Sequence, residues 1–550
     1  MLMAGMVAGL GMESLHTLGL VGAVVVSLVV VVRLSNDGVG STLRRRLLLG
    51  VPWGTLLVSG VVLTVYLVVQ GGWERPNAPM VIPFRAWSYF YPQGILAAPF
   101  SHAGLGHLTG NLFATLTLAS IAEYAWGHYP RERGVQTFSS VLTNPFGRIG
   151  AFVVGTLAVG VVTGVFSLGP AIGFSGVVFA FAGFALVRYP LATVVGVSAS
   201  SVISLLFSAV RNPILQQGGR SVFITPWWAS IAIQGHALGL FLGAVLGVLW
   251  VRRVDERPSA LRLFLGALLF AVVQNVWAVY APLDGGRYEL YRAGGTALVF
   301  LVAVLFVWAV RATDRTLVGR LDLHASEAAI GVVLAVTLAL AVVAVPFNFF
   351  TVADPDAGVT DANSIEVEDY TVFYAHDVPN QYISSVPIES ATVSSNVNAS
   401  GVIVVSEDRE IWWEVTSTGR LANDGRSLVR VGGVGWRESV TADFVSWSPV
   451  GNRSAYVVYL YHDQASRLAY VSDPSRADPT ITGRNVSVVP GREFTLRVTR
   501  GGETLGETTI PVGNNTTSAG GLTFVREDRR VLATTEDGTR VTVAVRPRDD

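Results

Sequence analysis

Ten apolar runs, each long enough to cross a lipid bilayer, constrain this chain more than any other feature. A spanning helix needs about 20 mostly apolar residues. The composition agrees, since 51% of the 550 residues are hydrophobic and 14% are charged, whereas soluble domains are about one quarter charged. The predicted spans are roughly 14–33, 48–70, 108–127, 149–168, 172–188, 190–210, 227–251, 260–281, 294–310 and 327–346.

Charge divides the chain into two parts. Residues 1–349 hold 21 arginines against 12 acidic residues, a net charge of +9, and residues 350–550 hold 18 against 27, a net charge of −9. The split predicts a basic membrane part and an acidic soluble part. Every one of the 39 basic residues is arginine, which is typical of a GC-rich genome, such as that of a halophilic archaeon. Cysteine is absent, which excludes disulfides and thiolate chemistry.

Arginine also predicts the orientation, because cytoplasmic loops are rich in basic residues. If the ten spans alternate, one face of the membrane receives 15 arginines and the other receives six. Both termini then lie outside the cell. The six arginines of the outer face are Arg75, Arg85, Arg211, Arg220, Arg287 and Arg292.

The C-terminal part has the pattern of a β-sandwich. Short runs such as "IWWEV" and "RVTVAVR" are separated by clusters of glycine, asparagine and aspartate, as in sandwich domains. Asn-X-Ser/Thr sequons occur here and not in residues 1–349, which favours an extracellular domain. The alternative is that serine-rich strands collect sequons by chance. The sequons begin at Asn398, Asn452, Asn485, Asn514 and Asn515.

Polar residues inside the predicted spans form the candidate site, since such residues are costly in a bilayer and mark function by default. His107 and Asn111 lie four apart on one helix face, Ser175 opens its helix, and His236 lies early in another. The alternation of spans brings all four to similar depth on the outer side. His102 lies at the lipid–water boundary, where a solvated structural role is the alternative.

This set of residues suits acyl transfer. A histidine can take the proton of a serine hydroxyl and return it to a leaving amine. Asn111, His107 and the free N–H groups at the start of the Ser175 helix would stabilise an oxyanion. Gly173 and Gly176 would allow a tight turn and close backbone approach.

Each element also has a simpler explanation. A lone serine in a membrane helix is usually packing material. Gly239 and Gly243 form a small-xxx-small repeat, for which close helix packing is the more usual role.

Three motifs together resemble the rhomboid family of intramembrane serine proteases. The first is "SHAGLGHLTGN" with His102, His107 and Asn111, the second is "GFSG" at 173–176, and the third is His236 with Gly239 and Gly243. The resemblance implies a Ser175–His236 dyad without an acidic third member. It further implies an oxyanion hole of His107, Asn111 and the Ser175 N–H, a buried structural role for Glu123, and a gate at 190–210 with its following loop.

The chain departs from the family pattern in several places. Phe179 replaces a tyrosine that stacks on the histidine, Gly235 replaces an alanine, and "FRAWSYF" lacks the Trp-Arg pair of the outer loop. We therefore predict a polytopic α-helical protein with a rhomboid-like six-helix core and about four extra helices, followed by an all-β sandwich-like domain. The expected divisions are an extra helix and loop at 1–47, the core at 48–251, three added helices at 252–349, and the β-domain at 350–550.

The expected function is hydrolysis of a peptide bond in membrane-spanning substrates near the outer face. The partners would be transmembrane proteins and the lipid bilayer. No metal, cofactor or nucleic acid is implied, and an extracellular ligand of the C-terminal domain stays open. Two alternatives remain: a non-catalytic protein that binds membrane clients, and a transporter whose histidines relay protons.

Overall fold

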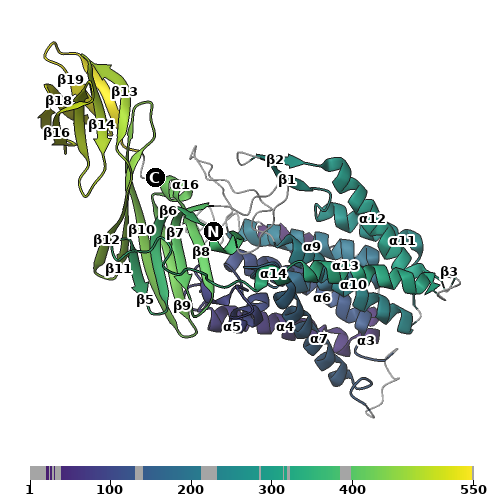
Figure 1. Cartoon of the computed structure of the whole chain (residues 1–550). Coiled ribbons are helices and arrows are strands. Elements are labelled where there is room, and N and C mark those ends of the chain that lie inside the picture. The colour runs from purple at the N-terminus through teal and green to yellow at the C-terminus, as the bar shows by residue number, and fades with distance from the viewer. Residues whose placement is uncertain are drawn as a thin grey trace, which may run out of the picture. The chain divides into compact units, whose positions relative to one another are not determined.

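The chain consists of a helical unit and a β-rich unit. The computed structural model describes residues 20–23, 25–27, 30, 39–130, 140–211, 232–254, 256–283, 287–313, 315–318, 323–384, 398–513 and 515–547. Among these residues, the first compact unit ends at Phe349 and the second begins at Phe350 (Figure 1). Most of the predicted span at 14–33 lies outside the described residues.

The helical unit follows the predicted spans closely. Five of its described helices are long and apolar enough to cross a membrane, namely α7, α9, α10, α12 and the run Ala325–Asn348. Shorter apolar helices occupy Trp53–Val69, Ser175–Arg188 and Ala260–Val273. The helices are α3 (Val39–Arg46), α4 (Trp53–Thr64), α5 (Pro92–Ala97), α6 (Leu105–Trp126), α7 (Pro145–Phe166), α8 (Ser175–Arg188), α9 (Pro190–Arg211), α10 (Ile233–Val254), α11 (Ala260–Val273), α12 (Arg292–Arg311), α13 (Ala325–Val342) and α14 (Val345–Asn348), with η1 (Leu48–Gly50), η2 (Val65–Val69), η3 (Ile82–Phe84) and η4 (Ala98–Phe100) between them.

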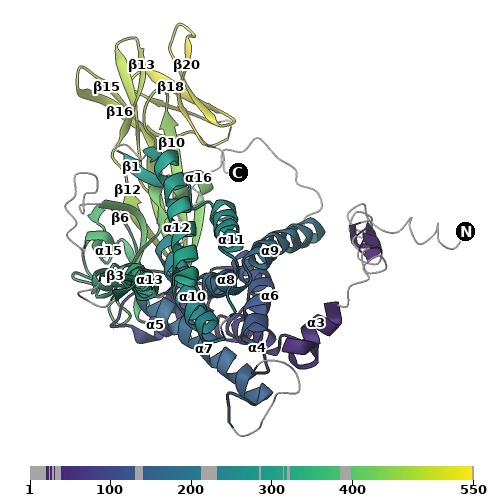
Figure 2. The same cartoon turned by 90° about the vertical axis from the view of Figure 1, so that its right-hand side faces the viewer.

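Helix α8 forms the centre of this unit, next to α6 and α10 (Figure 2). Glycines let α8 and α10 approach at backbone distance. A Cβ built on Gly239 would lie 2.0 Å from the Gly176 carbonyl oxygen, and one on Gly243 would lie 2.0 Å from that of Ala180. Any larger residue would force the helices apart, so the small-xxx-small repeat brings together the two helices that carry Ser175 and His236.

The predicted span 260–281 is wrong at its C-terminal end. Helix α11 stops at Val273, and Asn275 adopts a left-handed φ of 55°, a conformation that asparagine tolerates after a helix. The chain then forms a hairpin of β1 (Tyr280–Leu283) and β2 (Arg287–Leu290). A second short pair, β3 (Thr316–Val318) and β4 (Leu323–His324), precedes α13.

The β-rich unit contains two lobes, each made of sheets packed face to face. In the first lobe, Tyr370 of β6 donates from its hydroxyl to the Gly432 carbonyl of β9 at 2.8 Å, across the two sheets. In the second, one hydrophobic core joins Leu496 and Val498 of β15 to Phe524 of β18. The long strand β10 pairs with β9 and β11 and, at its end, with β20, so it runs through both lobes. All the strand pairs among the described residues of this unit are antiparallel.

Buried side chains alternate with half-buried ones along strands such as β15 and β18, as the sequence pattern predicts, whereas β7 is buried along most of its length. The prediction of a helical membrane protein followed by an all-β sandwich-like domain is confirmed. The strands are β5 (Ser364–Val367), β6 (Tyr370–Pro379), β7 (Asn398–Ser406), β8 (Ile411–Ser417), β9 (Arg426–Gly433), β10 (Trp436–Pro449), β11 (Ala455–His462), β12 (Ala465–Val471), β13 (Ser475–Ile481), β14 (Arg484–Val489), β15 (Thr495–Arg500), β16 (Glu503–Thr509), β17 (Thr516–Ala519), β18 (Leu522–Glu527), β19 (Arg530–Thr534) and β20 (Arg540–Val545), with the short helices α15 (Gln381–Ser384) and α16 (Thr418–Asp424).

Candidate active site

Ser175 and His236 meet at the N-terminal ends of α8 and α10. The Ser175 Oγ lies 2.7 Å from the His236 Nε2, a normal hydrogen-bond distance. Among the described residues, no carboxylate hydrogen-bonds to His236. The arrangement is therefore a serine–histidine pair in which Nε2 can accept the hydroxyl proton, with the other ring proton assigned to Nδ1.

The ring of Phe179 fixes the plane of His236. Phe179 lies one turn after Ser175 on α8, and the two rings stack with their centroids 4.5 Å apart and an interplanar angle of 12°. Such a contact limits rotation of the imidazole and keeps Nε2 directed at Ser175.

Gly173 shapes the turn that leads into Ser175. Its φ is +127°, and a Cβ at this position would lie 2.5 Å from the His107 Cε1 and 2.7 Å from the His107 Nε2. Its N–H donates to the Ala98 carbonyl at 2.9 Å. Only glycine satisfies both the backbone conformation and the space, and the His107 ring thus lies directly against the turn before Ser175.

Asn111 lies one turn after His107 on α6 and is 8% exposed, yet its Nδ2 has no hydrogen-bond partner among the described residues. The N–H groups of Ser175 and Gly176 have no acceptor within the first turn of α8, whereas those of Val177 and Val178 donate to the Phe174 carbonyl. Buried donors are normally satisfied. This site therefore offers unused donors, the property that an oxyanion site requires.

His102 is fully buried, which argues against the alternative that it is solvated at the lipid–water boundary. Its ring packs edge-on against His107 at 5.1 Å and against Tyr66 at 6.4 Å. Gln70 holds its backbone, accepting from the His102 N–H at 2.8 Å and donating to the His102 carbonyl at 2.9 Å. The Phe100 carbonyl lies near the ring without hydrogen-bond geometry. His102 thus supports His107 from behind.

Two polar residues that the sequence analysis missed hold the loop before the Gly173 turn. Gln234 accepts from the Leu168 N–H at 2.9 Å and donates to the carbonyls of Phe166 (2.8 Å) and Leu340 (2.5 Å). Asn348 donates to the carbonyls of Val165 (3.1 Å) and Ser167 (2.9 Å). The sequence could have indicated both residues, because amide side chains are unusual in apolar helices.

At the other end of α6, Glu123 is fully buried and accepts four hydrogen bonds. The donors are the Gly54 N–H, the Thr55 N–H and the Thr55 hydroxyl, each at 2.7 Å, and the His128 Nε2 at 2.6 Å. The His128 Nδ1 accepts from the Leu48 N–H at 2.8 Å, so the ring proton belongs on Nε2. The carboxylate stabilises the N-terminus of α4. His128 was not predicted.

A small pocket adjoins Ser175. Its volume is about 20 Å³, which is room for roughly one water molecule. A peptide needs far more space, so neighbouring elements must move to admit one. Described residues that line it include Ala98, Thr163, Ser167, Gly173, Gly235 and His236.

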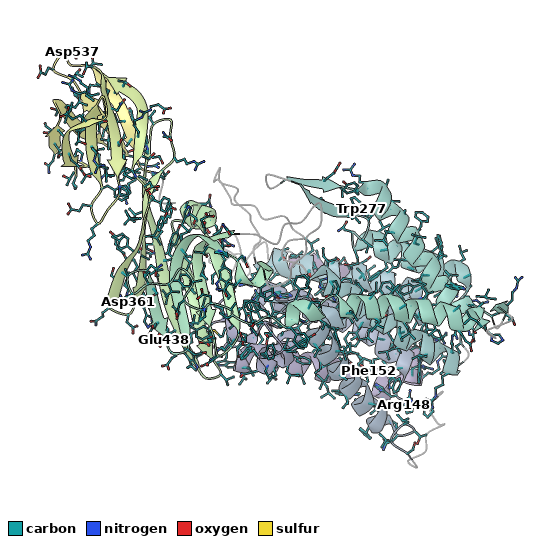
Figure 3. The ribbon with its side chains drawn as sticks, in the orientation of Figure 1. Arg148, Phe152, Trp277, Asp361, Glu438 and Asp537 are labelled. Carbon is teal, nitrogen blue, oxygen red and sulfur yellow. The ribbon has the colours of Figure 1, made fainter. Side chains whose placement is uncertain are left out.

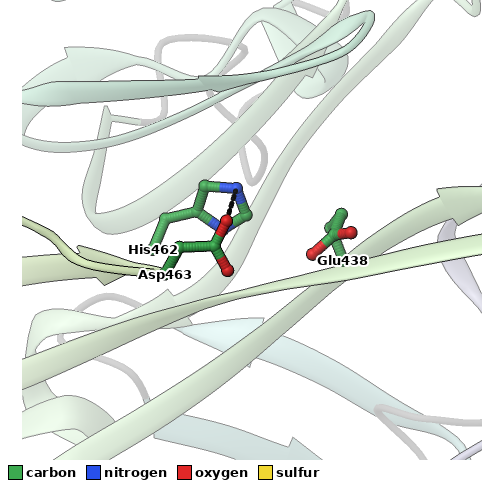
Figure 4. Close-up of side chains that lie close together, drawn as sticks. All are labelled: Glu438, His462 and Asp463. Atoms are coloured by element: carbon green, nitrogen blue, oxygen red, sulfur yellow. Dashed lines mark ion pairs between the residues drawn. The ribbon is translucent and has the colours of Figure 1, made fainter.

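One cluster with metal-ligand chemistry lies in the β-rich unit. Donor atoms of Glu438, His462 and Asp463 lie within 4.8 Å of one another (Figure 4). The His462 Nδ1 lies 3.2 Å from the Ser439 carbonyl. The Asp463 side chain is 82% exposed, and exposed acidic groups often come together without a metal, so we assign the cluster no role.

Residues 87–253 match the family model of the Rhomboid domain. This range contains every residue of the three motifs and excludes α4, α11 to α13 and the β-rich unit. Comparison with curated proteins gives no match, and comparison with solved structures gives none.

Proposed function

We propose that this chain is a serine protease that hydrolyses a peptide bond in membrane-spanning substrates. The premise is that it belongs to the rhomboid family through the domain at residues 87–253. The observation that carries the proposal is the 2.7 Å contact between the Ser175 Oγ and the His236 Nε2 inside this domain. The catalytic residues would be Ser175 as nucleophile and His236 as general base.

In the proposed reaction, Ser175 attacks the substrate carbonyl while His236 takes the hydroxyl proton. Collapse of the tetrahedral intermediate transfers that proton to the leaving amine and leaves an acyl-enzyme. Water then hydrolyses the ester by the same steps, and the small pocket beside Ser175 would supply it. Nucleophile and base come from this chain's own side chains.

The oxyanion would be stabilised by Asn111, by His107 and by the N–H of Ser175. The unpaired Nδ2 of Asn111 supports this role. For His107, the Ala103 N–H faces Nδ1 at 3.5 Å, a long contact that favours a proton on Nε2, the nitrogen next to Gly173. Preorganised donors of this kind lower the barrier without rearrangement during the reaction.

Substrate would enter past α9. All the buried side chains of this helix belong to its first half, namely Pro190, Thr193, Gly196 and Val197. The second half of α9 runs back toward the end of the bundle that carries Ser175. It buries fewer side chains against its neighbours, so it is packed more weakly. The excess of arginines on the opposite face supports a cut near the outer side of the membrane.

The test is cleavage of a model transmembrane substrate by purified protein in detergent. Wild type, Ser175→Ala, His236→Ala and the matched control Ser120→Ala would be compared, each checked for its melting temperature. We expect the dyad variants to lose at least about a thousandfold in rate and the control to lose nothing. Equal cleavage by all four would reject the dyad. A folded wild type that neither cuts nor reacts at Ser175 with a fluorophosphonate would favour a non-catalytic client-binding protein.

A further inference from the structure

The three helices that bear His107, Ser175 and His236 at their N-terminal ends converge again at their C-terminal ends. There, α6, α8 and α10 join α3 and the start of α7 around a pocket of about 1070 Å³. This volume is at the upper end of the range for small-molecule sites. Since α8 has 14 residues, the pocket lies about 20 Å from Ser175 along the helix. It is separate from the candidate active site.

The pocket carries a large excess of positive charge. Its described lining includes five arginines and one carboxylate, that of Glu256, which pairs with Arg188. The five arginines are Arg45, Arg46, Arg148, Arg188 and Arg253.

Among the described residues, the Arg148 guanidinium hydrogen-bonds only to backbone carbonyls. Arg148, at the start of α7 (Figure 3), is 4% exposed and donates to the carbonyls of Gly127 (2.7 Å) and Trp126 (2.5 Å). Arg46 donates to the Ala125 carbonyl at 2.8 Å. These carbonyls end α6 and offset part of the charge. Arg46 and Arg253 are close enough to Arg148 to repel it electrostatically.

Aromatic and apolar groups surround the charged cluster. Trp126 and Trp250 pack with ring centroids 4.6 Å apart, and the Arg148 guanidinium lies over the Trp126 ring at 4.4 Å. Leu142 lines the pocket and is 48% exposed, and Phe146, in the first turn of α7, is 68% exposed. Tryptophans and exposed apolar side chains at the end of spanning helices are typical of the membrane interface.

We propose that this pocket binds the phosphate headgroup of an anionic lipid. Guanidinium groups pair with phosphate oxygens through two parallel hydrogen bonds, and basic pockets between spanning helices recognise such headgroups. The exposed Leu142 and Phe146 favour a lipid over a free anion, because they offer contacts to its acyl chains. Bound lipid would join the C-terminal ends of α6, α8 and α10 and stabilise the bundle.

A purely structural role explains Arg46 and Arg148, which cap α6, but it does not explain Arg45 and Arg253, which are exposed at the rim. The test therefore uses Arg45→Gln with Arg253→Gln. The matched control, Arg262→Gln with Arg311→Gln, removes two exposed arginines that do not line the pocket. The full chain would be purified free of lipid in detergent.

Melting temperature and native mass spectrometry would be recorded with phosphatidylglycerol, phosphatidylcholine or inorganic phosphate. We expect phosphatidylglycerol at about 100 times its Kd to raise the melting temperature by roughly 5 °C. The pocket variant should bind it about a hundredfold more weakly, at about tenfold for each arginine, and the control should bind it like wild type.

Equal binding by the pocket variant and the control would overturn the site. Equal effects of phosphatidylcholine would overturn recognition of an anionic lipid, and a full effect of inorganic phosphate would replace the lipid by a free anion. Binding is measured without proteolysis, and Ser175→Ala should bind lipid like wild type. The result is therefore independent of the proposed function.

Discussion

The buried polar side chains near the two ends of α6 differ in whether they have hydrogen-bond partners. Near its C-terminus, Glu123 is fully buried and accepts four hydrogen bonds. Near its N-terminus, the Asn111 Nδ2 and both ring nitrogens of His102 are buried without a hydrogen-bond partner among the described residues. An unpaired buried polar group costs stability. The comparison indicates that one end of the helix is organised for stability and the other for binding a transient charge.

The largest expected effect is a loss of stability at the C-terminal end of α6, where the buried polar groups have hydrogen-bond partners. Glu123→Ala leaves the N–H groups of Gly54 and Thr55 and the Nε2 of His128 without their acceptor. We expect a loss of about 3–5 kcal/mol in the free energy of unfolding, as for a broken buried pair. Thermal unfolding in detergent measures it, with Ser120→Ala on the same helix as control. An unchanged melting temperature of Glu123→Ala would contradict the idea that the C-terminal end of α6 is organised for stability.

At the N-terminal end of α6, where the Asn111 Nδ2 has no hydrogen-bond partner among the described residues, Asn111→Ala should lower the cleavage rate and not the stability. Loss of one oxyanion donor lowers kcat by roughly a hundredfold to a thousandfold, while the melting temperature stays the same or rises because an unpaired buried amide is removed. Cleavage kinetics and thermal unfolding of the same samples check both. Thr109→Ala, two residues earlier, is the control. A fall in stability that matches the fall in rate would make Asn111 structural.

Close packing of α8 on α10 predicts a smaller loss. In Gly239→Ala the new Cβ meets the Gly176 carbonyl, and overpacking of this kind costs about 1–3 kcal/mol. Gly110→Ala is the matched change, because a Cβ there meets nothing within 4 Å. We expect only the first variant to melt earlier and cut more slowly. Similar behaviour of the two glycines would contradict the backbone contact.

The smallest effect concerns the ring that stacks on His236. Phe179→Leu removes an aromatic contact worth about 0.5–1.5 kcal/mol, so the cleavage rate should fall by about two- to tenfold. Phe179→Tyr keeps the stack and should stay within about twofold. If the tyrosine variant were as slow as the leucine variant, the stacking would not explain the role of Phe179.

Much of this arrangement could be predicted because apolar length and motif spacing are local properties of the sequence. The spans of α7, α9 and α12 were predicted within a few residues. The end of α11 was missed because apolarity alone extended the predicted helix to 281, although Asn275 and the Asp-Gly-Gly sequence of "APLDGGRYEL" are sequence signals of a helix end and of a hairpin.

Long-range hydrogen bonds could not be predicted in the same way. His128 lies just after α6, and its partner Leu48 is 80 positions earlier. Gln234 reaches across 106 positions to Leu340. Neither pairing leaves a periodic trace in the sequence, since it depends on which helices become neighbours.

The bonds of Gln234 and Asn348 have a consequence for how far the functional protein extends. The matched domain ends at residue 253, but the loop before Ser175 is tied to Asn348, and Gln234 is tied to α13. A fragment that stops after α10 would expose the carbonyls of Val165 and Ser167 beside the nucleophile. The smallest fragment that keeps the Ser175 turn in place therefore ends at Phe349, directly after α14.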